Sequence, residues 1–214
     1  MVRLENGEQR RISDVKVGDS VLAANELGQL QFSQVIMKAH DDPELTNRFQ
    51  TIRTKTGRNL TLTAYHLIYK ANLNEPSQDL KEIMSSKPVF ASEIKKGDFV
   101  LVSDENNQMM KDVVVSNDVV IRKGISAPIT AFGNIVVDDI LASCYTHYDH
   151  SFVHMLFAPI RWYYDTTHLL STMKMLDFHG SSEQEPEKSE QHWYPTTLYN
   201  FREYIFPDGK LTLH

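Results

Sequence analysis

Thr63 and His66 are the residues whose types and spacing first indicate chemistry in this sequence. They lie in the string LTLTAYHLI, which covers residues 60–68. A hydroxyl three residues before an imidazole, between two apolar strand segments, can bring both polar groups to one point. Acyl transfer uses such a pair, because the hydroxyl can donate to a developing oxyanion while the imidazole moves a proton. Spacing alone, however, favours a simpler interpretation, in which Thr63 caps a turn and His66 is a half-buried histidine with satisfied hydrogen bonds.

Cys144 is the only cysteine among the 214 residues. A single cysteine excludes an intrachain disulfide and a cysteine-rich zinc site, and it is the only thiol available for covalent chemistry. In its apolar stretch it is equally typical of a small buried hydrophobe. His147, His150 and His154 have the spacing of one helical face that could hold a metal. Histidines gather easily on amphipathic helices, so we predict no metal site and no cofactor.

The composition excludes several classes of protein. Hydrophobic residues make up 41% of the chain and charged residues 23%, which is typical of a folded protein rather than a disordered tail. Lys and Arg number 22 against 28 Asp and Glu, and this balance argues against a nucleic-acid partner. The sequence has no run of about 18 apolar residues that would span a membrane. Its first residues show no signal-peptide pattern.

A repeat organises the first two thirds of the chain. The string SDVKVGDSVL at residues 13–22 is similar to SEIKKGDFVL at residues 92–101, an offset of 79. With an offset of 76, Gly57 then matches Gly133. Repeats of this kind indicate a duplicated architecture. We therefore predict a β fold whose two halves are related by a pseudo-twofold axis.

Short β-branched runs separated by turn residues predict that residues 1–146 form an all-β domain. The Gly-Asp pairs at Gly18 and Gly97 precede two of these runs, and glycine suits such strand-entry turns because it tolerates a positive φ. The predicted strands are Ser20–Ala23, Ser33–Met37, Phe49–Arg53, Leu60–Thr63, His66–Tyr69, Phe99–Val102, Val113–Val115 and Asn134–Asp138.

The pattern changes after Cys144, and residues 147–214 are predicted to form a small α-helical tail. Apolar residues recur at spacings of three and four within residues 150–165, which indicates an amphipathic helix. A second amphipathic helix is predicted over residues 192–206. Residues 180–190 are polar and lack apolar periodicity, so we expect a flexible linker there.

Four segments, taken in order, resemble the Hint module of Hedgehog proteins, the self-processing fold that is shared with inteins. These segments are Leu4–Gly7, Val17–Leu22, Leu60–Leu67 and Ala142–Tyr145. The resemblance implies the Hint fold, whose internal duplication would account for the repeat. In the tail, residues 157–161 and 192–199 resemble the sterol-recognition region that follows Hint in Hedgehog precursors.

The resemblance of the tail implies a set of sterol- or membrane-binding residues. They are Phe152, Leu156, Phe157, Trp162, Trp193, Tyr194, Leu198 and Tyr199. Amphipathic rings of this kind suit a sterol or a membrane interface. They could equally pack on the β domain, and the sequence leaves the two alternatives open.

In the Hedgehog family, a cysteine at the first Hint residue attacks the carbonyl of the preceding glycine, and a sterol hydroxyl then displaces the thioester. The resemblance therefore implies a sterol such as cholesterol as co-substrate, a covalently linked amino-terminal signalling domain as partner, and the secretory pathway as location. Thr63 and His66 match the family's T-x-x-H motif, which implies that they polarise the scissile amide and help to expel its nitrogen. Cys144 matches the Ser-Cys-Tyr element near the nucleophile.

Two departures from the family pattern matter. Met1 aligns a short way downstream of the nucleophilic cysteine, so we expect a fragment, a truncated gene product or a degenerate copy that cannot perform the first step as given. His40 stands where the family places the aspartate that activates the sterol, and Asp41 follows it. His40 could act as the base near neutral pH, Asp41 could replace it after a small shift, or the acceptor differs. The alternative functions are a non-catalytic Hint remnant that binds lipid or membranes, and a protein-interaction domain.

Overall fold

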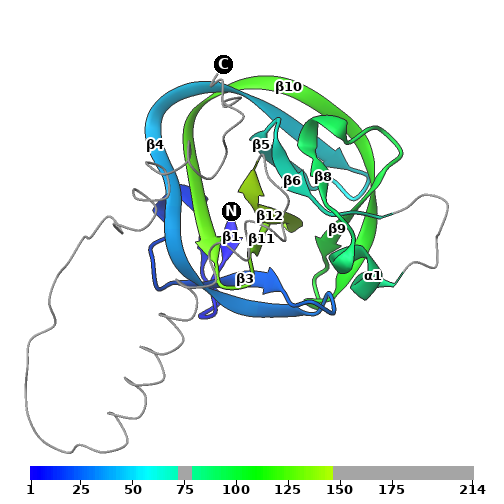
Figure 1. Cartoon of the computed structure of the whole chain (residues 1–214), viewed down its shortest axis with the longest axis horizontal. Helices are drawn as coiled ribbons and strands as arrows, with labels where there is room; N and C mark the ends of the chain where they lie inside the picture. Colours follow the sequence, from blue (N-terminus) through cyan, green and yellow to red (C-terminus); the bar gives the residue numbers. More distant parts are fainter. Residues whose placement is uncertain (72–78, 147–214) are drawn as a thin grey trace, which may run out of the picture. The chain divides into compact units, whose positions relative to one another are not determined.

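The computed structural model describes residues 1–71 and 79–146, and β-strands dominate both ranges (Figure 1). The strands are β1 (Val2–Arg3), β2 (Gln9–Arg10), β3 (Ser20–Ala24), β4 (Leu30–Thr54), β5 (Asn59–Thr63), β6 (His66–Ile68), β7 (Lys70–Ala71), β8 (Val89–Phe90), β9 (Phe99–Ser103), β10 (Met109–Thr130), β11 (Asn134–Val137) and β12 (Ile140–Thr146). The helical elements described are short: η1 (Ile12–Asp14), α1 (Leu80–Ser85) and η2 (Ala91–Glu93). The all-β prediction for this part of the chain is confirmed, and α1 is an element that the sequence analysis missed.

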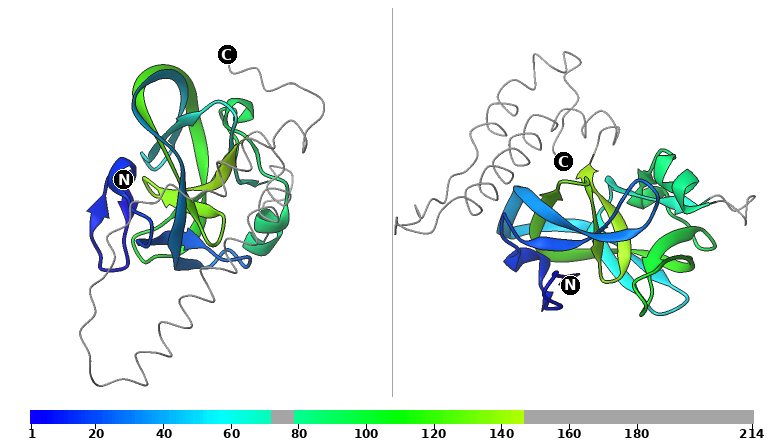
Figure 2. Two further views of the ribbon diagram at one scale, coloured as in Figure 1. Left: turned by 60° about the vertical axis from the view of Figure 1, so that its left-hand side comes forward. Right: turned by 90° about the horizontal axis from the view of Figure 1, so that it is seen from below.

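Two long strands, β4 and β10, form the frame of the fold. They pair antiparallel from Thr54 and Val114 at one end to Val35 and Thr130 at the other, with register shifts along the way. Such irregularities bend a ribbon and increase its twist. Figures 1 and 2 show that the ribbon curls around the hairpin of β11 and β12. The hairpin carries Cys144 on β12, so the frame determines what surrounds this residue.

The length of β4 corrects the sequence analysis, which predicted separate strands at 33–37 and 49–53. The structure has one strand of 25 residues across both. Most of residues 38–48 are exposed, so their side chains show no alternation of apolar and polar types. Pairing with β10, rather than local pattern, makes this stretch a strand. The predicted helices at 150–165 and 192–206 and the linker at 180–190 lie outside the described residues.

The predicted duplication is confirmed by equivalent hydrogen bonds. Gly18 donates its backbone N–H to the carbonyl of Val35 at 2.8 Å, and Gly97 donates in the same way to Val114 at 2.8 Å. Both glycines have a φ of +95°, which favours glycine over other residues. Because these donors and acceptors are each 79 residues apart, the two turns occupy equivalent environments.

The two halves also bond each other in an equivalent way. Lys55 donates its N–H to the carbonyl of Val113 at 2.8 Å, and Ala131 donates to the carbonyl of Gln34 at 2.9 Å. Each turn between strands therefore binds a strand of the opposite half. β6, at the end of the first half, pairs with β12, at the end of the second half.

The core lies where the halves meet. Fully buried side chains from both halves include Ile52 and Ile68 of the first and Ile140 and Leu141 of the second. Burying a large apolar side chain contributes about 1.5–3 kcal/mol. The packing of Leu141 and its neighbours therefore fixes β12, and with it the residues that contact β6.

Candidate functional site

His66 is the first residue of β6, and its ring reaches across to β12. The Nε2 atom lies 2.7 Å from the carbonyl oxygen of Ser143. A carbonyl oxygen only accepts hydrogen bonds, so Nε2 carries the hydrogen and donates it. The neutral ring then has an unprotonated Nδ1, which is the atom that can accept a proton.

Burial lowers the pKa of His66, because a charged ring loses hydration, and the hydrogen bond to the Ser143 carbonyl opposes part of this effect. The ring is therefore neutral at physiological pH. A neutral imidazole in a partly buried position can take up a proton and return it, which is what general acid–base chemistry requires.

An irregularity of β12 places the Ser143 carbonyl against the ring. β6 and β12 pair at Ile68 with Ala142 and at His66 with Thr146, with a register shift between the two pairs. Three residues of β12 therefore lie opposite one residue of β6. Such bulges re-aim backbone and side-chain groups and are frequent next to active sites.

Cys144 lies in the same bulge. Its side chain is 6% exposed, and its N–H donates to the carbonyl of Gly133 at 2.9 Å. The Sγ atom is 3.8 Å from the hydroxyl of Thr130, which donates to the carbonyl of Asn134 at 2.7 Å. Burial raises the pKa of Cys144 to about 11. The thiol is thus protonated and shielded at neutral pH, so it is not an activated nucleophile in this state.

Thr63 is the last residue of β5, three residues before β6 begins, and it is half-buried. It pairs with Phe49 of β4. Along β5, Leu62 is buried while Thr61 and Thr63 lie on the opposite face. The hydroxyl of Thr61 lies 3.0 Å from the hydroxyl of Thr51, so this face of β5 carries polar side chains.

His40 and Asp41 lie on the exposed part of β4, opposite Ala127 and Ser126 of β10. Asp41 accepts a hydrogen bond from Nζ of Lys38 at 2.7 Å, and this contact lowers the pKa of Asp41. A carboxylate with a lowered pKa is a weaker base. The partner of Asp41 in the structure is thus Lys38, with which it forms an ion pair.

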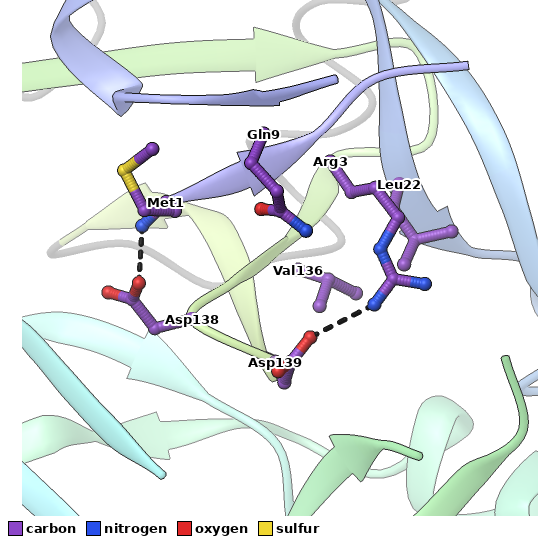
Figure 3. Close-up of a pocket in the computed structure, with 7 residues that line it drawn as sticks. All are labelled: Met1, Arg3, Gln9, Leu22, Val136, Asp138 and Asp139. Carbon is purple, nitrogen blue, oxygen red and sulfur yellow. Dashed lines mark hydrogen bonds and ion pairs between the residues drawn. The ribbon is translucent and has the colours of Figure 1, made fainter. Parts of the chain in front are cut away.

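The chain start is held at the turn between β11 and β12. The carbonyl of Met1 accepts a hydrogen bond from the N–H of Asp138, in the turn between β11 and β12, at 2.8 Å. Figure 3 shows Met1 and Asp138 at a pocket of about 260 Å³. His66 contacts Ser143, five residues after Asp138 along the chain, which is at most roughly 16 Å at a strand rise of about 3.3 Å per residue.

Comparison with known proteins agrees with this architecture. The family model described as "Hint module" matches residues 1–207. This chain belongs to the Hint family. Its sequence is 33% identical to the Sonic hedgehog protein of Danio rerio over 213 residues, which cover 99% of this chain and 49% of that protein. It is 30% identical to the Protein hedgehog of Drosophila virilis over 212 residues, which cover 96% of this chain and 42% of that protein.

Solved structures agree with the fold of this Hint module. A DnaB intein from Synechocystis sp. PCC 6803 has a TM-score of 0.54 at 15% sequence identity, and the alignment covers 69% of this chain and 94% of that chain. This likeness concerns the fold alone. The Hint module spans about half the length of the curated relatives that it matches. The division into residues 1–146 and 147–214 stays a prediction.

Sequence reasoning missed several polar residues at the centre of this Hint module. Thr130, Asn134 and Ser143 are at most 3% exposed. Asn134 accepts a hydrogen bond from the N–H of Ala24 at 2.8 Å and donates to its carbonyl at 2.9 Å. A single polar residue inside an apolar strand is the signal that could have found Ser143, because a buried hydroxyl needs a partner.

Metal ligands do not gather in the part of the Hint module that the structure describes, since no group of three or more His, Cys, Asp or Glu there could hold an ion. His147, His150 and His154 lie outside the described residues, as do the predicted sterol- or membrane-binding residues. None of the helices in residues 1–71 and 79–146 is long and apolar enough to cross a membrane.

Proposed function

We propose that this Hint module is the self-processing domain of a hedgehog-type precursor. The observation that carries the proposal is the hydrogen bond from His66 to the Ser143 carbonyl, which holds a neutral, partly buried imidazole at a bulge beside Cys144. A histidine with a purely structural role could have both ring nitrogens in hydrogen bonds. Here the hydrogen bond uses Nε2 and leaves Nδ1 as the proton acceptor.

In the proposed first step, a cysteine placed upstream of Met1 attacks the carbonyl carbon of the glycine that precedes it. The thiol gives its proton to Nδ1 of His66 as a carbon–sulfur bond forms, the carbon–nitrogen bond breaks, and His66 returns this proton to the released amine. Thr63 donates to the oxygen on which negative charge develops. About five residues would link this cysteine to Met1, because the chain from Asp138 to Ser143, the partner of His66, spans at most roughly 16 Å.

In the proposed second step, a sterol hydroxyl displaces the thiol, and the amino-terminal domain leaves as a sterol ester. His40 is the proposed base, because Asp41 is held by Lys38. A signalling domain as covalent partner and passage through the secretory pathway follow from the similarity to hedgehog proteins. Sterol binding is proposed for the predicted helices at 150–165 and 192–206.

The test is a fusion in which a carrier protein ending in Gly-Cys is joined to Met1 through zero, three, five or seven residues. We expect dithiothreitol to cleave the five-residue fusion and to leave the zero-residue fusion intact. His66→Ala should slow cleavage by about 10²-fold or more, because the amine loses its proton donor. No cleavage at any linker length would refute the proposal and would favour a non-catalytic remnant.

The second step has its own readout. His40→Ala should leave dithiothreitol cleavage intact while it reduces the formation of a sterol ester, because a thiolate needs no base and an alcohol does. The sterol ester is detected by mass spectrometry after incubation with cholesterol in detergent. An equal loss of both products in the His40→Ala fusion would exclude a role that is confined to the second step.

A further inference from the structure

Ser143 is buried completely, and its hydroxyl has a specific task in the bulge of β12. The Oγ atom accepts a hydrogen bond from the N–H of Tyr145, two residues further on, at 3.1 Å. A serine that bonds the backbone two residues away offers the chain a turn in place of a regular ladder. The next N–H, that of Cys144, donates away from β6 to Gly133 at 2.9 Å.

We propose that Ser143 is a positioning residue for His66: its hydroxyl holds the bulge closed, and the bulge presents the Ser143 carbonyl to Nε2. The same residue thus supplies the brace through its side chain and the acceptor through its backbone. The consequence for the reaction rests on the proposed function. The two hydrogen bonds, at Ser143 Oγ and at His66 Nε2, do not depend on that function.

The carbonyl contact decides which nitrogen of His66 can react. With Nε2–H held at 2.7 Å from an acceptor, the neutral ring keeps a single tautomer, and Nδ1 is always the unprotonated atom. If the bulge relaxes, the acceptor moves away and the ring can exchange between tautomers. Loss of the contact also removes the interaction that favours the protonated ring, so the pKa of His66 should fall further.

The first experiment follows His66 in the full chain by nitrogen-15 NMR of labelled histidines between pH 5 and 8. The His66 signals are assigned by their absence from the spectrum of a His66→Gln variant. Two other titratable side chains near the bulge, Cys144 and Tyr69, have pKa values raised by burial, so they stay neutral over this range. We expect the Nε2–H tautomer alone in the unmodified protein. An Nδ1–H tautomer would overturn the proposal before any variant of Ser143 is made.

The second experiment compares Ser143→Ala with a matched control, Ser103→Ala. Ser103 is 1% exposed, and its hydroxyl donates to Asp139 at 3.1 Å, at the opposite end of the β11–β12 hairpin. Ser143→Ala should lower the pKa of His66 and mix its tautomers, whereas Ser103→Ala should change neither. Ser143→Thr keeps the hydroxyl and should restore both. An unchanged His66 in folded Ser143→Ala would overturn the proposal.

The third experiment places the same variants in the five-residue fusion. Because the hydrogen bond from the Tyr145 N–H is lost, Ser143→Ala should slow dithiothreitol cleavage about fivefold or more, and Ser103→Ala should not. Equal rates for Ser143→Ala and the parent would overturn the link to the reaction. If the parent fusion does not cleave, the proposed function fails, and the NMR comparison still decides the role of Ser143.

Discussion

The pH dependence of stability gives the sharpest test of the environment of His66. Burial lowers the pKa of this residue below its ordinary value of 6.5 in the folded chain. The unfolded chain therefore binds a proton first as the pH falls, so the contribution of His66 to stability is complete above pH 6.5 and decreases below it. If the folded ring stays neutral at pH 5.5, the loss between pH 7.5 and 5.5 reaches at most about 1.4 kcal/mol.

The measurement is guanidinium unfolding followed by far-ultraviolet circular dichroism at steps of half a pH unit. The quantity to plot is the difference in unfolding free energy between the parent and His66→Gln, because the other titrating groups cancel in it. Carboxylates such as Asp41, whose pKa is lowered by Lys38, titrate below this window. A difference that is constant from pH 7.5 to 5.5, or that grows as the pH falls, would refute the reasoning.

Two further predictions concern burial and symmetry. Cys144 should react with iodoacetamide at pH 8 about 100-fold more slowly in the folded chain than in guanidinium. The reason is that burial raises the pKa of Cys144 from 9.0 to about 11, and the thiolate is the reactive form. Equal rates would contradict the burial of Cys144. Gly18→Ala and Gly97→Ala should each destabilise by about 1–2 kcal/mol in chemical denaturation, because both have a φ of +95° and an added Cβ meets no neighbouring atom. A large difference between these two costs would contradict the equivalence of the turns.

The sequence predicts those parts of the fold that bury one face of a strand. Ile52 pairs with Leu60 across β4 and β5, and both are buried, so the runs that contain them show β-branched and apolar residues in the expected pattern. The repeat is visible for a related reason, since Gly18 and Gly97 are required by the same backbone geometry. Local constraints of this kind leave a local signal.

The remaining features depend on contacts between distant segments and leave no such signal. The exposed middle of β4 is a strand only because it pairs with β10. The position of Met1 depends on the turn at Asp138, which no pattern near residue 1 reveals. The sequence placed His66 of the T-x-x-H motif correctly at the start of a strand. The hydrogen-bond partner of His66, however, is a backbone carbonyl. Every residue has such a group, so the sequence cannot indicate which one is the partner.

The repeat also explains why the imidazole lies where the two halves meet. If the offset of 76 residues is kept along the chain, His66 is equivalent to Ala142 and Ile68 to Cys144. The ladder pair of Ile68 with Ala142 would then have a symmetry mate between His66 and Cys144, but the structure pairs His66 with Thr146. Two additional residues of β12 at this point break the symmetry, and they turn a carbonyl toward the ring. A duplicated scaffold can thus place its histidine site in one half alone, because the irregularity is confined to a single strand.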